Sequence, residues 1–379
     1  MTERFSASPL VHSEKYVTTH GLLGALMDQK RFIFVISDLF GGGAQKSLLY
    51  TADSLRRLGY PVRVYTLREQ VEHRIPEGLE VINLAVMNWF TKAFNTEKIE
   101  KWQAGVIARA IDNFNADVVL SCSCDRITRH IHHPNLYFWI KSDSAAQFRN
   151  HHKRDKAFAK QRKYYNGRKI IAVSHGVEKN LQEIIGIQPS HIQTIYNPYD
   201  RQPLLEMAQE TVTTPFDEYF IHVGAFSNVK RHDRLLRAYA QSGVETPLIL
   251  LGKGETENYI RSLIDKLKLG EKVTILGYQS NPYPFIQYAK ALILTSDAEG
   301  LPRVLIEALL LHTPVISTNC PSGPEEILTG ELADFLIEQD NEKGLAEAIA
   351  RMDRNPISID KRYYQQFLTE NVLPQFEAL

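Results

Sequence analysis

Apolar runs that alternate with helical segments dominate the chain from about residue 31 onward. The first run, 31–37, is apolar at nearly every position, which is typical of a strand buried on both faces of a parallel sheet. A glycine loop follows it, then a helical pattern over 44–58 that Gly59 ends, and then a second apolar run at 61–67. This strand–helix–strand unit predicts a doubly wound α/β domain.

The same alternation continues in two series. We expect the remaining strands of the first series at 116–122, 135–140, 169–174 and 191–197, and those of the second at 219–224, 247–251, 272–276, 289–295 and 314–317. Residues 1–30 are polar and are interpreted as an arm or short helix, and the Thr-rich and Pro-rich segment 201–215 as an irregular linker. The sequence therefore predicts a first domain over 1–200 and a second over 201–357. The helical segment 358–379 has no strand after it and is expected to pack back on the first domain.

The composition is that of an ordinary globular protein. Of 379 residues, 44% are apolar and 23% charged, which excludes a disordered, collagen-like or disulfide-stapled chain. The three cysteines, Cys122, Cys124 and Cys320, are expected to be small buried thiols, and they complete no zinc site. The N-terminus lacks the apolar core of a signal peptide, and no stretch reaches the roughly 20 apolar residues of a spanning helix. We therefore expect a cytoplasmic protein that at most lies on the inner face of the membrane.

The formal charge is zero in total but divided between the halves. The chain has 44 Lys and Arg against 44 Asp and Glu, a balance that argues against a dedicated nucleic-acid binder. Residues 1–200 carry a net +8 and residues 201–379 a net −8. Ten cations lie within 141–169, interleaved with aromatic residues. A basic amphipathic helix of this kind favours contact with an anionic membrane surface, and the alternative is a solvated helix with surplus charge.

Glycine-rich or charged loops follow several of the predicted strands. The loop Gly41-Gly42-Gly43 precedes a helix, where backbone amides can approach an anion, although a plain tight turn has the same sequence. Lys230 and Arg231 stand at the start of another helix, where cations oppose the helix dipole and so favour a function such as diphosphate binding. A third turn, at Gly252, allows a close backbone approach to a ligand but is equally consistent with packing.

Residues 296–309 form the strongest motif. Pro302 is expected at the first helical position, which turns the amides of Gly300, Leu301 and Arg303 toward an anion. Glu299 precedes this helix, and Glu307 lies within it among apolar neighbours. A buried carboxylate must be paired or hydrogen-bonded, and vicinal ribose hydroxyls would satisfy it, as would a structural ion pair. The segment 319–327, a Pro- and Gly-containing loop that opens a helix, is expected beside this motif, at the carboxyl edge where open α/β sheets bind ligands.

With these motifs in place, the chain from Phe32 onward resembles the retaining GT-B glycosyltransferases of family 4. Glu299 and Glu307 match the family's Glu-x7-Glu motif, and further matches are the glycine loop, 172–174, 195–198, the Lys230 loop, 276–278 and 299–302. Within the family, 276–283 and 320–324 are similar to bacterial enzymes that build lipopolysaccharide, capsule or lipid-linked glycans. The resemblance implies a GT-B fold, in which two Rossmann-like domains face each other across a cleft.

The resemblance also implies residue roles. Glu307 would hold the ribose hydroxyls of a nucleotide sugar, Glu299 would contact the transferred sugar, and Lys230 would neutralise the leaving diphosphate. The amides of Gly300 and Leu301 would hold hydroxyls or phosphate, Gly42 and Gly43 would close on the diphosphate, and Gly277 and Tyr278 would lie near the base. No metal and no cofactor are implied.

Two positions depart from the family pattern. Ala225 stands where the family usually has Arg, for which Arg231 is a candidate replacement from another direction. Lys141-Ser142-Asp143 stands where the family often has His after the strand, so Lys141 or Asp143 is expected to contact the sugar 6-hydroxyl or the acceptor.

We therefore expect a retaining transferase that moves a hexose-type sugar from a UDP-sugar to a glycan acceptor, lipid-linked or part of lipopolysaccharide. Two alternatives stay open. One is a sugar phosphorylase or nucleotide-sugar epimerase of the same fold, and the other is a catalytically inactive sugar-binding or membrane-binding module.

Overall fold

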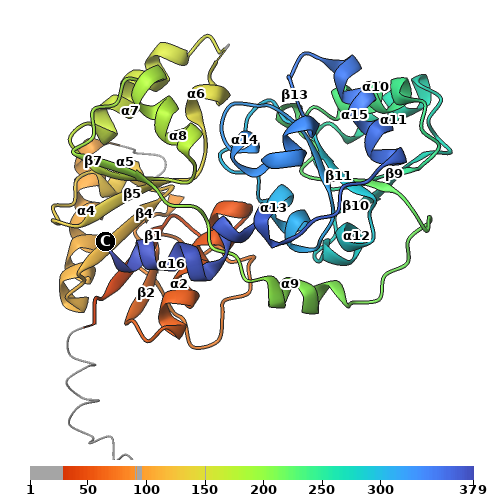
Figure 1. Cartoon of the computed structure of the whole chain (residues 1–379). Coiled ribbons are helices and arrows are strands. Elements are labelled where there is room, and N and C mark those ends of the chain that lie inside the picture. Colours follow the sequence, from red (N-terminus) through yellow and green to blue (C-terminus); the bar gives the residue numbers. More distant parts are fainter. Residues whose placement is uncertain (1–28, 90, 92–95, 150) are drawn as a thin grey trace, which may run out of the picture.

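The computed structural model describes residues 29–89, 91, 96–149 and 151–379. Two α/β domains lie side by side, each a parallel sheet with helices on both faces (Figure 1). The predicted fold class, two doubly wound domains, is confirmed. The arm expected at 1–30 lies almost entirely outside the described residues.

The first domain is built on seven parallel strands in the order β3-β2-β1-β4-β5-β6-β7. Its strands are β1 (Phe32–Ile36), β2 (Val62–Thr66), β3 (Glu80–Asn83), β4 (Val118–Cys122), β5 (Leu136–Ile140), β6 (Lys169–Ala172) and β7 (His191–Thr194). Every residue of β1, β4 and β5 is buried because helices cover both faces of the sheet, which explains their continuous apolar runs. The edge strand β3 was not predicted, since it is short and only partly buried.

The helices of this domain are α2 (Gly43–Arg57), α4 (Glu97–Phe114), α5 (Asp125–Thr128), α6 (Ser144–Gln147), α7 (Arg154–Tyr165) and α8 (His175–Lys179). The basic stretch 141–169 is therefore divided between α6 and α7 and is not one continuous helix. Phe158 and Tyr165 of α7 are buried in the domain core, so part of the aromatic interleaving in this stretch serves packing.

The second domain repeats the design with six parallel strands in the order β10-β9-β8-β11-β12-β13. Its strands are β8 (Phe220–Val223), β9 (Leu248–Leu251), β10 (Val273–Gly277), β11 (Ala291–Leu294), β12 (Val315–Thr318) and β13 (Leu336–Ile337). Its helices are α10 (His232–Ser242), α11 (Glu257–Lys266), α12 (Tyr283–Gln287), α13 (Arg303–Leu310), α14 (Pro324–Ile327) and α15 (Glu342–Arg354). The strand order reverses beside β1 in the first sheet and beside β8 in the second. Open α/β sheets bind ligands at the carboxyl ends of the strands at such switch points.

The segment predicted to be an irregular linker begins as a helix, α9 (Arg201–Ala208). Leu204 and Ala208 are buried, and Pro203 lies in the first turn, where its missing N–H removes no helical hydrogen bond. The prediction of an irregular linker was therefore wrong for the first half of 201–215.

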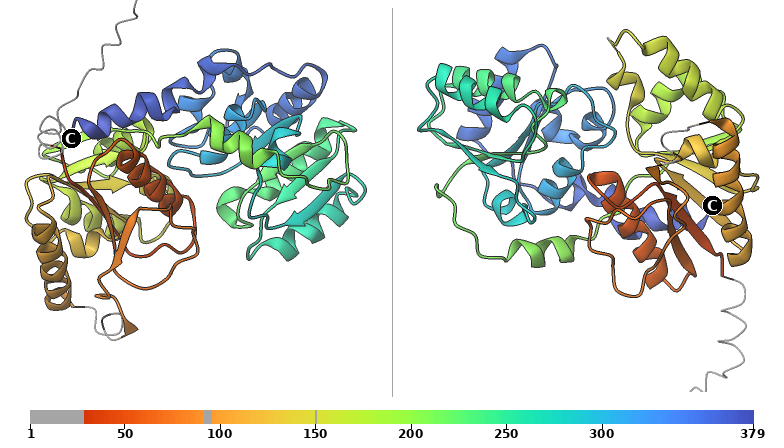
Figure 2. Two further views of the ribbon diagram at one scale, coloured as in Figure 1. Left: turned by 90° about the horizontal axis from the view of Figure 1, so that it is seen from below. Right: turned by 180° about the vertical axis from the view of Figure 1, so that it is seen from behind.

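The chain crosses between the domains twice, and the two crossings run side by side. Tyr199 donates its backbone N–H to Phe367, and Thr369 donates to the carbonyl of Tyr199, both at 2.9 Å. After the second crossing, α16 (Thr369–Glu377) lies on the first domain (Figures 1 and 2). There Phe376 packs edge-on against Trp139, with ring centroids 5.3 Å apart.

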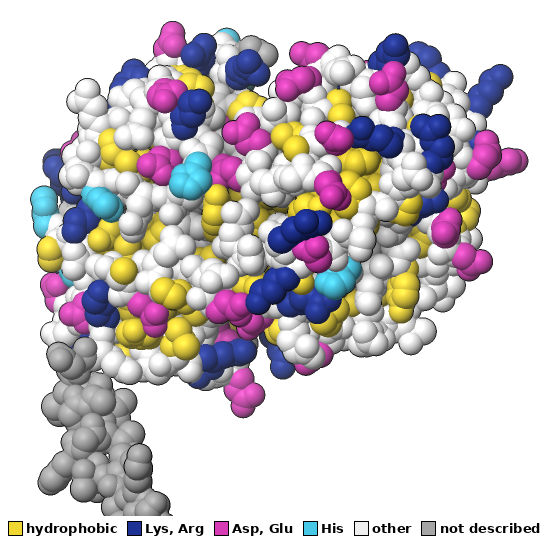
Figure 3. Space-filling model, in the orientation of Figure 1, with side chains coloured by type: hydrophobic (Ala, Val, Ile, Leu, Met, Phe, Trp, Pro, Cys, Tyr) yellow, Lys and Arg dark blue, Asp and Glu magenta, His cyan; other side chains and the backbone are white. Residues whose placement is uncertain are grey.

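Acidic and basic side chains are mixed over both domains on the face shown in Figure 3. The opposite net charges of the two halves therefore do not separate into regions of one sign on that face. Among the residues that the structure describes, no helix combines the length and apolar character required to cross a bilayer.

Candidate active site

A cavity of about 430 Å³ opens between the two domains, at the carboxyl ends of strands from both sheets. We call it the interdomain cleft. Its first-domain wall is lined by Gly43, Ala44, Ser47, Lys141, Ser142, Gln147 and Asn197, and its second-domain wall by Val223, Val229, Lys230, Ala298, Glu299, Gly300, Leu301, Pro302, Arg303, Val304 and Glu307. The cleft thus adjoins the switch point of each sheet, beyond β1 on one side and beyond β8 and β11 on the other.

Lys230 and Glu299 form an ion pair on the second-domain wall. The Lys230 Nζ donates to Glu299 Oε1 at 2.5 Å, and both side chains are largely buried. Lys230 ends a 3₁₀ turn, Asn228–Lys230, that follows β8, and Glu299 lies in the loop between β11 and α13. The fold therefore brings together two charged groups 69 positions apart at the edge of the cleft.

Glu307 is buried on α13 and held by two neighbours. Its Oε1 accepts from Arg303 Nη2 at 3.0 Å and from the Tyr283 hydroxyl at 3.4 Å. Lys46, on α2 of the first domain, donates to the same Tyr283 hydroxyl at 2.7 Å. Within the described residues Glu307 Oε2 has no hydrogen-bond partner. It is therefore free to accept hydrogen bonds from the hydroxyl groups of a ligand in the cleft. Burial lowers the pKa of Lys46, an effect that the carboxylate of Glu307 opposes.

Lys141 lies on the opposite wall, directly after β5. Its Nζ donates to Ser47 Oγ at 2.6 Å and to Asn197 Oδ1 at 2.7 Å, and it stands 2.9 Å from the centre of the Trp139 ring. Burial holds the pKa of Lys141 well below its ordinary value, and the charge of nearby Arg303 lowers it further. The amine is thus a preoriented polar group on the first-domain wall.

Close approach of the opposite domain explains two glycines of the cleft. A Cβ on Gly300 would come within 2.3 Å of the Lys141 carbonyl oxygen, and one on Gly43 within 2.9 Å of Arg303 Cδ. Ser174 Oγ also donates to the Gly300 carbonyl at 2.7 Å. These glycines let the two domains meet at the ends of the cleft.

Glu326, which lies on α14 within the predicted segment 319–327, is a further link between the domains. It accepts the backbone N–H of His175 at 2.9 Å, that of Gly176 at 2.8 Å and the hydroxyl of Tyr196 at 2.9 Å. These hydrogen bonds connect the two walls of the cleft.

Helix α13 starts one residue later than predicted. It begins at Arg303, so Pro302 occupies the N-cap position with an extended backbone and is not the first helical residue. Gly300 and Leu301 still line the cleft beside this helix start. Glu307 is consequently the fifth residue of α13. It lines the cleft from the second turn of this helix.

Several candidate residues do not line the cleft. The Arg231 guanidinium is bound by Asp233 and Asp297, at 2.9 and 3.1 Å, and these carboxylates raise its pKa. This acidic pairing offsets the unfavourable cation at the start of α10, and the role of Arg231 in donor binding stays a prediction. Asp143 accepts from Ser322 Oγ and from Asn180 Nδ2, both at 2.7 Å, and caps α6, so its carboxylate links the two domains.

The remaining predicted glycines and Tyr278 also lie outside the cleft lining. A Cβ on Gly252 would meet the Gly224 carbonyl oxygen at 1.9 Å, so this turn is explained by packing. Gly42 and Gly277 have open space where a Cβ would stand. Tyr278 is 57% exposed, with the Lys253 amine 4.5 Å from its ring centre. Their roles in donor binding stay predictions.

Four residues of the site were not predicted to have a role. Lys46 and Ser47 are consecutive residues of α2 with no distinguishing motif, whereas Asn197 precedes Pro198 shortly after β7, a signal that could have indicated it. Tyr283 approaches the site only because α12 packs against α13, which no local pattern reveals.

The three cysteines are free and buried, as predicted. Burial raises the pKa of Cys122 to about 11 and that of Cys124 and Cys320 as well. In the part of the chain that the structure describes, no group of three or more His, Cys, Asp and Glu side chains is arranged to hold a metal ion.

Two family models match the chain, one for each domain. The model described as Glycosyltransferase Family 4 matches residues 41–202, and the model described as Glycosyl transferases group 1 matches residues 207–366. Together they extend over both walls of the interdomain cleft.

Curated relatives and solved structures agree with these models. A 4-alpha-N-acetylgalactosaminyltransferase of Campylobacter jejuni, named for a diphospho-undecaprenol substrate, is 31% identical over 48% of this chain and 50% of its own length. The lipopolysaccharide 1,6-galactosyltransferase of Escherichia coli is 27% identical over 52% of this chain and 58% of its own length. The matched segments thus span only about half of these relatives. The structure of Anabaena HepE, solved with UDP and glucose, superimposes with a TM-score of 0.71 at 16% identity, covering 92% of this chain and 99% of that one, which supports the GT-B fold.

Proposed function

The chain belongs to the GT-B glycosyltransferases of family 4, and on that premise we propose that it transfers a hexose-type sugar from a UDP-sugar to a lipid-linked or lipopolysaccharide glycan, with retention of the anomeric configuration. The observation that carries the proposal is the Lys230–Glu299 ion pair, which faces Lys141 across a cleft whose second-domain wall also presents Glu307.

The second-domain wall has the groups that a nucleotide diphosphate sugar requires. Glu307 Oε2 is available to accept the ribose hydroxyls, while Arg303 and Tyr283 keep its other oxygen in place. Lys230 supplies a positive charge for the diphosphate, and Arg303 adds a second cation in the cleft. Glu299 contacts the transferred sugar, and the Gly300 and Leu301 amides hold its hydroxyls or the adjoining phosphate.

The transfer step uses charge stabilisation and positioning. The bond between the sugar C1 and the β-phosphate oxygen breaks, and the bond between C1 and the acceptor oxygen forms on the same face of the sugar. The acceptor hydroxyl proton passes to the leaving phosphate oxygen. The Lys230 ammonium offsets the negative charge that develops on the leaving UDP, and no protein nucleophile takes part. Because these cations serve the leaving group, the proposal includes no metal ion and no cofactor.

The acceptor side of the proposal rests on the first-domain wall and on the relatives' names. Lys141, held by Ser47 and Asn197, offers a hydrogen-bonding amine toward the sugar or the acceptor. The two relatives above are named for a lipid-diphosphate and a lipopolysaccharide substrate, which supports an acceptor of that class here. We accordingly propose that the protein works in the cytoplasm or at the inner face of the membrane.

A binding screen followed by product analysis tests this function. The purified chain is titrated with UDP-, GDP- and ADP-sugars in a calorimeter, and the reaction with the preferred donor is followed by NMR of the anomeric proton. The proposal predicts binding of UDP-sugars and a product with the donor's anomeric configuration. Inverted product, or release of sugar 1-phosphate in phosphate buffer, would contradict it, the latter in favour of a phosphorylase.

A further inference from the structure

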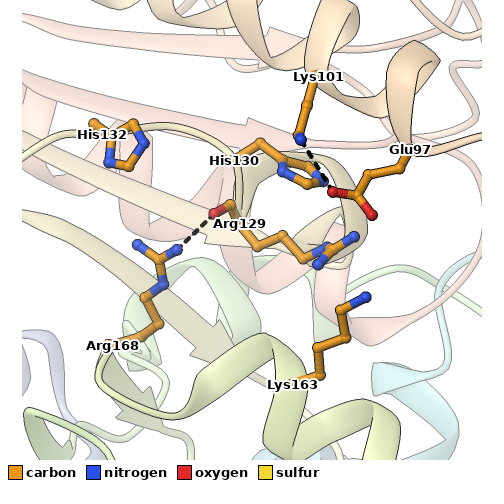
Figure 4. A pocket seen from close by; sticks show the side chains of 7 residues that line it. All are labelled: Glu97, Lys101, Arg129, His130, His132, Lys163 and Arg168. Atoms are coloured by element: carbon orange, nitrogen blue, oxygen red, sulfur yellow. Dashed lines mark hydrogen bonds and ion pairs between the residues drawn. The ribbon is translucent and has the colours of Figure 1, made fainter.

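A second cavity, of about 450 Å³, lies in the first domain and has a strongly basic lining. We call it the first-domain pocket. It is lined by Glu97, Lys101, Arg129, His130, His132, Lys163 and Arg168 (Figure 4). These residues come from α4, from the segment after α5, from α7 and from the turn before β6. None of them lines the interdomain cleft, so the pocket is a separate site.

The central cation of this pocket is held in a fixed position. The side chain of Arg129 is only 11% exposed, and its Nη2 donates to the buried carboxylate of Glu100 at 2.8 Å. The Arg129 guanidinium also lies 4.8 Å from the centre of the Tyr164 ring. Glu100 further accepts from Arg126 at 3.2 Å and faces His130 at the same distance. A charged fork that is positioned before ligand binding loses little conformational freedom when it binds an oxyanion.

Three further polar groups around the pocket have donors to spare. Lys163 and His132 make no hydrogen bond or ion pair with any residue that the structure describes, and Arg168 uses only Nη2, which donates to the Arg129 carbonyl oxygen at 2.7 Å. Figure 4 shows the Arg129 and Lys163 side chains extending toward the same side of the pocket, where Glu97 also lies.

The pocket keeps a positive balance after its carboxylates are counted. Glu97 pairs with Lys101 at 3.1 Å, and the nearby cations, Lys101 first and then Lys163, lower its pKa. Glu100 is shared by Arg126 and Arg129. Among the described residues, Lys163 and Arg168 therefore have no ion-pair partner, and both line the same pocket as Arg129. Like charges gathered around a hollow repel one another, so this arrangement is stabilised by an anion and is unfavourable without one.

From this geometry we propose that the first-domain pocket binds the phosphate group of a phosphate ester, with Arg129, Lys163 and Arg168 as its cationic contacts. Arg129 Nε donates to the Arg126 carbonyl oxygen at 3.1 Å and Nη2 donates to Glu100, which leaves Nη1 for a ligand. This group and the free donors of Arg168 suit the oxygens of phosphate, and Lys163 adds a mobile point charge. The phosphate ester is either soluble or the headgroup of a lipid. Trp102, the residue after Lys101 on α4, is 55% exposed, and tryptophan is a residue type enriched at membrane–water interfaces.

Two probes distinguish these sources. Glycerol 3-phosphate is titrated into the full chain by calorimetry, and co-sedimentation is measured with vesicles of phosphatidylcholine alone and with phosphatidylglycerol at one part in four. Lys163→Gln and the double variant Lys163→Gln/Arg168→Gln are compared with a matched control, Lys153→Gln/Lys156→Gln, which removes two exposed cations of the same basic stretch that do not line the pocket.

We expect the double variant to weaken binding of at least one probe by tenfold or more, the single variant by less, and the control by no more than twofold. Loss for glycerol 3-phosphate identifies a soluble ester, and loss only for phosphatidylglycerol vesicles identifies a lipid headgroup. Lys163 is exposed and unpartnered, so the single variant tests the pocket without a risk to folding. The proposal is overturned if the wild type binds neither probe, or if the control loses as much as the pocket variants. Lys230→Ala, which changes only the interdomain cleft, should keep this binding, so the outcome is independent of the transferase proposal.

Discussion

Lys230 Nζ lies 2.5 Å from Glu299 Oε1, and the two side chains close one wall of the interdomain cleft. An ammonium and a carboxylate at this distance, both largely screened from water, attract each other strongly. A bound diphosphate would compete with Glu299 for the same ammonium. Under the proposed function, the pair would keep Lys230 in position until a donor binds and would release it to the diphosphate.

Replacing Lys230 should affect catalysis more than folding. For Lys230→Ala we predict that kcat falls by roughly 100- to 1000-fold, because one preorganised positive group near the leaving diphosphate is lost. Lys272→Ala serves as the control, because it removes a lysine far from the cleft lining whose amine contacts the exposed Glu245 and the Val244 carbonyl oxygen. Steady-state rates of UDP release measure both variants. An unchanged kcat for Lys230→Ala would exclude the proposed role.

Glu299→Gln should separate binding from transfer. The substitution removes the carboxylate that competes for Lys230 and keeps the size of the side chain, so we predict that UDP binds as tightly as to the wild type or more tightly. Transfer should nevertheless fall by 100-fold or more, since the contact with the reacting sugar is altered. Calorimetry with UDP and a turnover assay test the two halves, and weaker UDP binding together with normal turnover would contradict the assignment.

Glu307 should report on the ribose. We predict that the wild type prefers UDP to 2′-deoxy-UDP by about tenfold, equivalent to about 1.4 kcal/mol for a hydroxyl–carboxylate contact. Glu307→Gln, which can still accept from Arg303, should lose most of that preference. Dissociation constants for the four combinations form a double-mutant cycle, and a coupling energy near zero would remove Glu307 from the ribose site.

Lys141 should act on the acceptor side only. In Lys141→Met the Ser47–Asn197 hydrogen bond of 2.6 Å can persist while the amine is lost. We predict UDP binding within twofold of the wild type, and kcat/KM for the acceptor reduced by tenfold or more. An equal loss of UDP affinity and acceptor efficiency would indicate a general disturbance of the cleft instead.

The buried histidines beneath the Lys230 loop should make the fold sensitive to acid. Burial, aided by the charge of Lys230, lowers the pKa of His232 from 6.5 to about 4, and burial lowers that of His222 as well. At a pH between 6.5 and about 4, His232 binds a proton in the unfolded chain but not in the folded chain. The free energy of unfolding therefore falls as the pH drops from about 6.5 toward 4. For His232 this amounts to about 2 kcal/mol between pH 7 and pH 5.

His232→Phe should reduce that loss. The ring of His232 already packs against Phe226, at 4.8 Å between centroids, and neither of its nitrogens has a partner among the described residues. Urea unfolding at pH 7 and at pH 5 measures the difference. A variant that loses as much stability on acidification as the wild type would show that His232 is not the responsible group.

The sequence predicted the parts of this structure that local pattern determines. The strands β1, β4 and β5 are continuous apolar runs because both faces of the sheet are covered, and Glu299, Glu307 and Lys230 stand in loop and helix positions that the motif spacing reveals. The contacts that cross the cleft could not be predicted in the same way. Arg231 precedes α10 as expected, but two carboxylates, one of them 66 positions away, bind its guanidinium.

The same limit applies to the other side chains that long-range packing places. Asp143 follows a strand and has the chemistry of an acceptor-binding group. In the structure, however, its carboxylate accepts a hydrogen bond from Ser322 of the second domain. Tyr283 reaches Glu307 from another helix, and Lys46 reaches Tyr283 from another domain. Such contacts depend on how the two domains meet, and only the three-dimensional structure contains that information.

A crystal structure of the chain with bound UDP tests the central claim most directly. The account predicts that the diphosphate lies in the interdomain cleft within hydrogen-bond distance of Lys230 Nζ, and that the ribose hydroxyls donate to Glu307 Oε2. UDP bound outside this cleft, or bound within it with the ribose directed away from Glu307, would contradict it.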